Sequence, residues 1–390
     1  MKRNFLILLC LILFIVSIAC VSATEDVNQT DNLELSSNSN SEDKVDLDNN
    51  NGLDENNDLG EKLESDSNIL AMSKADKLTG KEIVVENFTF GDIQNAVNSA
   101  DEGDTVYLKA GTYFNNENGQ INIRQNNISI VGVKDSTILD AQKTSGIFDI
   151  YATSGITIKD IVFINGNADY GGAIYVFNDI DNVNIDATFI NNTAFHGGAN
   201  YFVRTVSNVN ISGTYINNTA ESDGGANYFV GTVSDSYISG NYINNTAGDG
   251  GANYFVGTVS DSDISGTYIN NTASYGGANY FVGTVSDSDI SGTYINNIAK
   301  YYGGANYFYG TVSNVNSSGT YINNTAKGYD GGANYFFNAV SNVNISGTYI
   351  NNTAKYYGGA NDFFNAVSNV NISGTYINNT VEYYGGANDF

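Results

Sequence analysis

The pattern of apolar and polar positions repeats along the second half of the chain. Each unit opens with Gly-Gly-Ala, first at Gly171 and last at Gly385, and successive triplets lie 26 to 28 residues apart. The unit holds three short segments: Gly-Gly-Ala-Asn-Tyr-Phe, Val-Ser-Asn-Val-Asn-Ile-Ser-Gly and Thr-Tyr-Ile-Asn-Asn-Thr-Ala. β-Branched and aromatic residues bounded by Gly, Asn, Asp and Ser are typical of strands separated by turns. No segment of the unit has a 3.6-residue apolar period long enough for a helix, so helical solenoids are excluded.

Three strands in a unit of this length fit one coil of a parallel β-helix. A propeller blade needs four strands in roughly 40 to 45 residues. In a β-helix each strand lies on its copy about 4.8 Å along the axis, so that identical side chains stack in columns. Length differences between units fall in the loop before Gly-Gly, where a turn absorbs them. We therefore predict an all-β fold, a single-chain parallel β-helix with regular coils over 171–390.

Residues 81–170 carry a helical segment and less regular strands. Ile93, Ala96 and Val97 have helical spacing, and Asp92 is placed as an N-cap. We predict a helix over 92–100 that covers the open edge of the first coil. Early strands are expected at 83–85, 104–108, 111–113, 121–123, 128–132, 137–140, 147–148 and 156–158.

The first 80 residues have another composition. Residues 1–23 combine Lys2 and Arg3 with an apolar run and a small-residue site at Ala23, which indicates a signal peptide; a retained N-terminal anchor is the alternative. Both cysteines lie in that segment, so the mature chain is expected to have no disulfide. Because the apolar run would be removed with the signal, no membrane span is expected either. Residues 24–80 hold 15 Asp and Glu against 4 Lys and Arg, and we expect a disordered acidic linker. The expected location is secreted or at the cell surface.

Several stretches carry a resemblance to a known family. Ile-Gln-Asn-Ala-Val (93–97), Gly-Asp-Thr-Val-Tyr-Leu (103–108), Ala-Gly-Thr-Tyr (110–113), Ile-Val-Gly (130–132) and Gly-Gly-Ala-Ile-Tyr (171–175) resemble the opening of pectin-lyase-like right-handed β-helix proteins. The Gly-Gly-Ala and Asn-Asn-Thr-Ala coils are similar to those of adhesin-like surface proteins of methanogenic archaea. The resemblance covers about residues 81–390 and implies an archaeal surface protein built on this fold.

The repeats also indicate which side chains face the interior. The Tyr of Asn-Tyr-Phe gives way to Asp362 and Asp389 in the last two coils. Because unpaired carboxylates are costly to bury, this position is expected to face solvent, and by alternation Asn and Phe face inward. Ile is the inward residue of the second strand. In Thr-Tyr-Ile-Asn-Asn either Tyr215 or Ile216 could face inward, and the sequence leaves this open.

An outward tyrosine column is the candidate binding face. Tyrosine has an apolar ring and a hydrogen-bonding tip, which suits sugar rings and protein partners. Cell-surface glycans or proteins are therefore the expected partners, although stacking between neighbouring strands alone also explains such a column. Its members are Tyr201, Tyr228, Tyr254, Tyr280, Tyr307 and Tyr335.

Charge gives a second candidate feature. The formal net charge of −26 argues against nucleic acid as a partner. Aspartates stack on consecutive coils, where they form either an ordinary acidic face screened by solvent and salt or a site in which Ca²⁺ bridges carboxylates. Otherwise no cofactor is expected. The aspartates of this column are Asp235, Asp261, Asp263, Asp287 and Asp289.

The chain is also rich in N-glycosylation sequons, which are a hypothesis about surface loops. One set belongs to Asn-Asn-Thr and a second to the strand before it; we favour the second because its asparagines alternate with inward Ile. The first set is Asn191, Asn217, Asn244, Asn270, Asn323, Asn351 and Asn378, and the second is Asn210, Asn316, Asn344 and Asn371.

The residues for catalysis are sparse. The family resemblance implies that lyases of this fold use an Arg or Lys base beside carboxylate-held calcium, and outside the signal the chain has only two arginines, Arg124 and Arg204. Hydrolases need paired carboxylates at defined separation, and the Asp pairs of the repeats look like drifting surface positions. His196 stands alone in a turn. We therefore expect no enzyme but an adhesin-like or spacer protein; a secreted carbohydrate-active enzyme with a site on the early coils, and a purely structural envelope component, are the alternatives.

Overall fold

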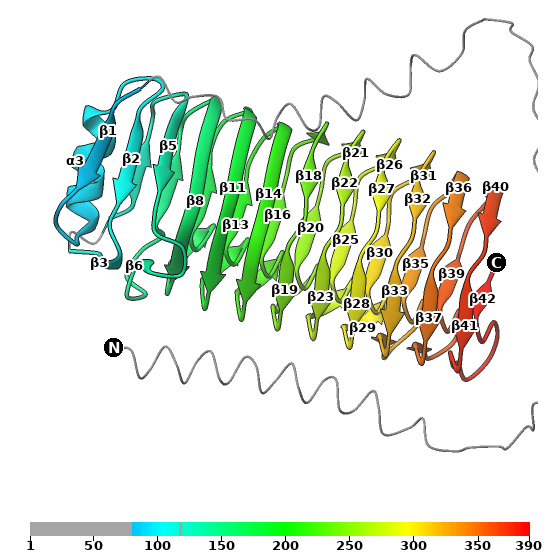
Figure 1. The fold of residues 1–390 in the computed structure, drawn as a ribbon. Coiled ribbons are helices and arrows are strands. Elements are labelled where there is room, and N and C mark those ends of the chain that lie inside the picture. The colour runs from blue at the N-terminus through cyan, green and yellow to red at the C-terminus, as the bar shows by residue number, and fades with distance from the viewer. Residues whose placement is uncertain (1–79, 117–118) are drawn as a thin grey trace, which may run out of the picture. The chain divides into compact units, whose positions relative to one another are not determined.

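The computed structural model describes residues 80–116 and 119–390, which form a parallel β-solenoid of about 11 turns. Figure 1 shows the coils stacked side by side from the blue helical end to the red last coil. The all-β parallel solenoid predicted from the repeats is confirmed. The expected signal peptide (1–23) and all but the last residue of the expected linker (24–80) lie outside the described residues.

The helix caps the first coil, as expected, but begins earlier. Helix α3 spans Phe90–Ser99, and its N-cap is Thr89 rather than Asp92: Oγ1 of Thr89 accepts a hydrogen bond from the backbone N–H of Asp92 at 3.2 Å. The backbone N–H of Asn122 donates to Oε1 of Gln94 at 2.6 Å, and Nε2 of Gln94 donates to the carbonyl of Asn122 at 3.1 Å. These two bonds satisfy backbone groups on the edge of the first coil.

The coils build one sheet of 24 strands, one of 11 strands and two small sheets, and the strands pair in parallel with their copies in the neighbouring coils. In one pairing Asn227, Tyr228 and Phe229 lie opposite Asn253, Tyr254 and Phe255. The sheet of Asn-Tyr-Phe segments has 11 strands: β4 (Ile121–Ile123), β7 (Phe148–Ile150), β10 (Ile174–Val176), β13 (Asn200–Phe202), β16 (Asn227–Phe229), β20 (Asn253–Phe255), β25 (Asn279–Phe281), β30 (Asn306–Phe308), β35 (Asn334–Phe336), β39 (Asn361–Phe363) and β42 (Asn388–Asp389).

The largest sheet has 24 strands and holds the other two apolar segments of the unit. Its strands are β1 (Glu82–Val85), β2 (Thr105–Leu108), β3 (Gly111–Phe114), β5 (Ile128–Val131), β6 (Thr137–Asp140), β8 (Ser154–Ile164), β11 (Ile180–Ile190), β14 (Val206–Ile216), β17 (Val233–Ser234), β18 (Tyr237–Ile238), β19 (Asn241–Ile243), β21 (Val259–Ser260), β22 (Asp263–Ile264), β23 (Thr267–Ile269), β26 (Val285–Ser286), β27 (Asp289–Ile290), β28 (Thr293–Ile295), β31 (Val312–Ser313), β32 (Asn316–Ser317), β33 (Thr320–Ile322), β36 (Val340–Ile345), β37 (Thr348–Ile350), β40 (Val367–Ile372) and β41 (Thr375–Ile377). The Thr-Ala segments form two small sheets: β9 (Asn167–Tyr170), β12 (Thr193–His196) and β15 (Thr219–Asp223), and β24 (Thr272–Tyr275), β29 (Ile298–Tyr302), β34 (Thr325–Ala326) and β38 (Thr353–Ala354).

The inward positions are those expected. The Phe and Asn of Asn-Tyr-Phe are buried from Asn200 to Phe363, and so are the Ile residues of the second strand from Ile211 to Ile345. Phe281 lies between Phe255 and Phe308, with ring centroids 4.9 and 4.8 Å away and ring planes within 3°. The core is therefore a set of stacked columns that run along the axis.

The third strand turns its tyrosine inward, which settles the alternative left open by the sequence. Tyr268 is fully buried and stacks on Tyr242 at 4.8 Å and on Tyr294 at 4.7 Å, whereas Ile269 is half-buried. Its phenol donates a hydrogen bond to the carbonyl of Ser265 at 3.0 Å. The ring is thus enclosed without stranding its hydroxyl.

Two asparagine ladders accompany the rings. In the expected one, Nδ2 of Asn253 donates to Oδ1 of Asn279 at 2.9 Å. The second is formed by the latter Asn of Asn-Asn-Thr, where Nδ2 of Asn271 donates both to Oδ1 of Asn297 at 3.0 Å and to the carbonyl of Tyr242 at 2.9 Å. Each amide satisfies its neighbour, so the buried polar columns have no desolvated donor at these positions.

The Gly-Gly pair stands at a tight turn and at a close approach of adjacent coils. Gly224 has φ +65°, and a Cβ on it would lie 2.4 Å from the carbonyl oxygen of Asn227. A Cβ on Gly225 would lie 2.2 Å from the carbonyl oxygen of Gly251 in the next coil. A larger residue at Gly224 would strain the turn within its own coil, and one at Gly225 would push the next coil away.

One coil breaks the isoleucine column. Ser317 is fully buried and lies in register between Ile290 and Ile345. We expect Ser317→Ile to raise the free energy of unfolding by about 1–2 kcal/mol, because it restores buried apolar surface next to two isoleucines. Denaturant titration checks this, and a lower midpoint would show that the coil has closed around the smaller side chain.

Candidate functional site

The tyrosine column lies on the outer side of the 11-stranded sheet but is covered. Tyr201 and Tyr228 are 9% exposed, Tyr307 4% and Tyr335 2%, while Tyr254 and Tyr280 are half-buried. The prediction of an exposed stripe is therefore wrong for those four buried rings. Neighbouring rings along the column lie 4.6 to 5.2 Å apart, and most pairs are tilted or edge-on, as aromatic contacts often are.

The cover comes from the residue before each Gly-Gly pair. The ring of His196 stacks on Tyr228 at 5.2 Å, and the ring of Tyr302 stacks on Tyr335 at 4.6 Å. The sequence does contain a signal for this, since the position before Gly-Gly is Tyr, His or Asp in every coil from residue 170 to 384. Alternation along the strand shows which face the tyrosines occupy but not what lies over that face.

Carboxylates replace aromatic rings at some positions, both in the tyrosine column and among the residues before Gly-Gly that cover it. Asp362 is only 4% exposed, so the expectation that its position faces solvent is wrong. Burial, and then the neighbouring carboxylates of Asp330 and Asp389, raise the pKa of Asp362 to about 8. Burial and the carboxylate of Asp223 raise the pKa of Asp249 to about 7. An aspartate can occupy a buried tyrosine position because its carboxyl group is protonated there over much of the pH range.

The raised pKa values predict that stability falls as pH rises. Below about pH 4 these carboxyls are protonated in both states, and between about pH 4 and 8 the unfolded chain loses their protons first. The melting temperature should therefore drop by on the order of 5 °C from pH 4.5 to pH 8.5. Asp362→Asn should flatten this dependence.

The exposed Asp261 offers a matched control, since Asp261→Asn removes one carboxylate from solvent and should leave the pH dependence unchanged. A melting temperature that rises with pH, or an equal effect of the two substitutions, would contradict the assignment of the pH dependence to the buried carboxyls.

His196 has a partner that the sequence did not reveal. Its Nδ1 lies 2.9 Å from Oδ2 of Asp223, and Oγ of Ser222 donates to the same Oδ2 at 2.8 Å. His196 and Asp223 lie opposite each other in neighbouring strands β12 and β15. The carboxylate thereby orients the imidazole over Tyr228. Arg204, the other isolated candidate, is exposed on the same coil as Tyr201.

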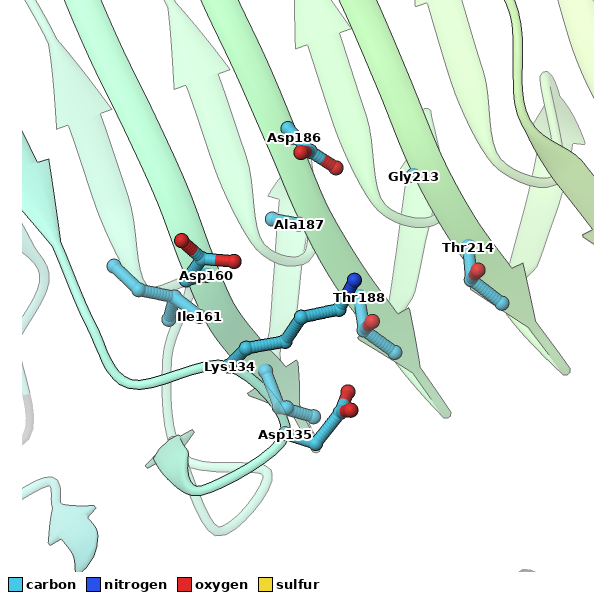
Figure 2. A pocket seen from close by; sticks show the side chains of 10 residues that line it. Lys134, Asp135, Asp160, Ile161, Asp186, Ala187, Thr188, Gly213 and Thr214 are labelled. Carbon is cyan, nitrogen blue, oxygen red and sulfur yellow. The ribbon is translucent and has the colours of Figure 1, made fainter. Parts of the chain in front are cut away.

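A pocket of about 140 Å³ lies on the early coils, beside the largest sheet. Figure 2 shows Lys134 and Asp135 on the loop between β5 and β6, with Lys134 reaching toward Thr188 of β11. Asp160 of β8 and Asp186 of β11 also line it. The pairing of β8 with β11 shifts register between Asp186 and Thr188, which both line this pocket. No motif in the sequence marks these residues, because the three aspartates come from separate coils.

The aspartate column of the regular coils lies at a turn and beside it. Asp235, Asp261 and Asp287 are exposed in the left-handed region, with φ between +50° and +51°. Asp263 and Asp289 lie opposite each other in β22 and β27. Among the described residues no group of three or more His, Cys, Asp or Glu is placed to hold a metal ion. Calcium bridging at these aspartates stays a prediction, which a calcium titration followed by the melting temperature tests.

The sequons occupy two different environments. Asn210, Asn316, Asn344 and Asn371 are all exposed, and Nδ2 of Asn344 donates to Oδ1 of Asn316 at 3.1 Å. In the first set Asn244 and Asn270 are half-buried, and Asn191, Asn217, Asn323, Asn351 and Asn378 are exposed. Glycosylation stays a prediction, which the intact mass of the native protein tests.

Within the described residues no helix is long and apolar enough to span a membrane. Comparison of the chain with protein-family models, with curated proteins and with solved structures found no match.

Proposed function

We propose that the chain is an exported, adhesin-like protein of a cell surface, which uses the solenoid as a stiff spacer to present an outer face. One observation carries the proposal: the inner columns continue in register from coil to coil, while outward positions vary. From Phe202 to Phe390 neighbouring rings of the phenylalanine column stay within 7° of parallel. Such close packing resists bending, as a spacer requires.

The variation at outward positions supports display rather than a single catalytic cleft. The position after Asn-Tyr-Phe is Val230 in one coil and Tyr309 in a later one, and the equivalent position after Asn-Asp-Phe is Phe364; the last two are exposed. The resemblance to adhesin-like proteins of methanogenic archaea agrees with this role. Surface glycans or proteins are the proposed partners.

The test is to label intact cells of the producing organism with antibodies raised against residues 171–390. Labelling without permeabilisation is expected, together with weaker attachment of a strain that lacks the gene. Labelling only after permeabilisation would contradict export. Surface labelling with unchanged attachment would favour the purely structural envelope role.

The pocket on the early coils favours a second candidate, a secreted carbohydrate-active enzyme. Lys134 supplies a cation beside Asp135, Asp160 and Asp186, and groups of this kind act as bases and acids on sugars. Release of uronates or reducing ends from acidic polysaccharides tests it, with Asp186→Asn compared with Asp235→Asn on a distant coil. The enzyme candidate fails if the unaltered chain releases nothing.

A further inference from the structure

Cationic side chains are concentrated on one ladder of the regular coils. From residue 171 to 390 the sequence has four Lys or Arg residues, and Lys300, Lys327 and Lys355 among them stand on consecutive coils. Each directly follows the alanine of an Ile-Ala or Thr-Ala segment, and these alanines lie opposite one another in β29, β34 and β38. The lysines therefore recur about every 4.8 Å along the axis.

A groove lies over the same strands. It has a volume of about 430 Å³, and alanines of β34 and β38 contribute to its lining. That volume is in the range of sites that hold small ligands, roughly 300–1,000 Å³. The polar side chains along it are Thr325, Lys327, Thr353, Lys355, Thr380 and Glu382.

Tyrosines run beside the lysines. The rings of Tyr301, Tyr329, Tyr356 and Tyr383 follow one another at 5.9, 5.9 and 5.4 Å between centroids. Unlike the covered tyrosine column, this row reaches solvent: Tyr329 is 41% and Tyr383 62% exposed. Nζ of Lys300 lies 4.9 Å from the ring centroid of Tyr301, and Nζ of Lys355 lies 4.8 Å from that of Tyr356.

Within the described residues these lysines form no close ion pair, although the carboxylate of Glu382 on the next coil attracts Lys355. In the described part of the chain none of the three is within 4.0 Å of a carboxylate oxygen. The ring faces hold two of the ammonium groups in place, and their N–H donors stay available to an anion. Glu382 occupies the equivalent position one coil further on and ends the run of positive charge. An otherwise acidic protein thus carries one short positive ladder with aromatic rings at its side.

We propose that this lysine–tyrosine ladder, made of Lys300, Lys327 and Lys355 with Tyr301, Tyr329, Tyr356 and Tyr383, binds an acidic glycan chain. Carboxylates of the glycan contact Lys327 and Lys355, sugar rings lie on the tyrosines, and hydroxyls of Thr325 and Thr353 bond sugar hydroxyls. Nucleic acid is disfavoured because its affinity comes mainly from many phosphate contacts, whereas three lysines are few and the net charge is −26. The proposal rests on the proposed surface function and names its ligand class.

Fluorescence anisotropy of a labelled hyaluronan hexasaccharide with the purified full chain tests the ladder. Saturable, salt-sensitive binding is expected, and Lys327→Gln with Lys355→Gln should weaken it by at least about tenfold, since bonds to charged groups are strong. Arg204→Gln removes a cation from a distant coil and should change the affinity by less than about twofold. Unlabelled chitohexaose, a neutral chain of equal length, should not compete.

Several results would overturn the proposal. One is unchanged affinity in the double lysine variant, with its melting curve intact. Others are an equal loss in Arg204→Gln, competition by chitohexaose, or binding of a thymidine hexanucleotide as tight as that of the glycan. Surface labelling of cells stays a separate measurement, so a surface-located chain that ignores the hexasaccharide refutes the ladder and leaves the proposed export untouched.

Discussion

Replacing Phe281 by Ala is expected to lower the free energy of unfolding by about 3–5 kcal/mol. The ring is fully buried and is stacked between Phe255 and Phe308 at 4.9 and 4.8 Å. Removing it leaves a cavity and also deprives two neighbouring rings of a contact. Because each coil of a solenoid is stabilised by its neighbours, amide hydrogen exchange should accelerate in the coils on both sides.

The same substitution at Phe364 is the control. That ring is 62% exposed and stacks on Phe337 of the preceding coil at 5.3 Å. Phe364→Ala should cost less than about 1 kcal/mol. If chemical denaturation gives the two variants similar midpoints, the phenylalanine column is not a main source of stability.

Asn271→Asp is expected to destabilise the chain by about 3–5 kcal/mol at pH 7. The buried Nδ2 of Asn271 donates to the carbonyl of Tyr242 and to Oδ1 of Asn297. A carboxylate cannot donate a hydrogen bond. The carbonyl oxygen of Tyr242 and Oδ1 of Asn297 would therefore each face a negatively charged oxygen in the buried core. Burial raises the pKa of such a carboxyl in the folded chain, and the deficit should therefore shrink as pH falls from 7 toward about 4, the usual pKa of an unfolded aspartate.

The neighbouring Asn270→Asp separates this effect from a general effect of added charge. Asn270 is half-buried at a turn with φ +56°, a conformation that Asp tolerates. Urea titrations at pH 5 and pH 7 should show a small, nearly constant change for Asn270→Asp. A similar, pH-independent loss in both variants would mean that the inner amide ladder contributes little.

The repeats allowed the fold and most of the interior to be predicted. A column of Phe or Ile recurs once per coil and alternates with polar residues, so its facing follows from strand geometry. Strand geometry could not predict which of Tyr215 and Ile216 faces inward, because both are apolar enough to be buried. Their facing depends on the carbonyl of a neighbouring residue, such as Ser239 for Tyr242, that accepts the phenolic hydrogen bond.

The outer layers were harder to predict, because they depend on contacts between segments far apart within a coil. Asp362 was expected to face solvent, because burying a charged carboxylate is costly. In the folded chain it is buried, and its raised pKa keeps the carboxyl protonated, which removes that cost. The groove beside Lys327 and Lys355 exists only once the coils are stacked. Before that, the two residues are 28 positions apart and look like isolated surface lysines.

The in-register core has a consequence for the gene. If residues 250–275 were deleted, strand β20 would be lost, and Asn227 would lie on Asn279 and Phe229 on Phe281. Each side chain would meet the same residue type that it meets now in β20. Unequal recombination between such similar repeats can therefore shorten or extend the protein by whole coils, about 4.8 Å each, without requiring a new interface. The reach of the molecule can change in one genetic step while its cross-section stays constant.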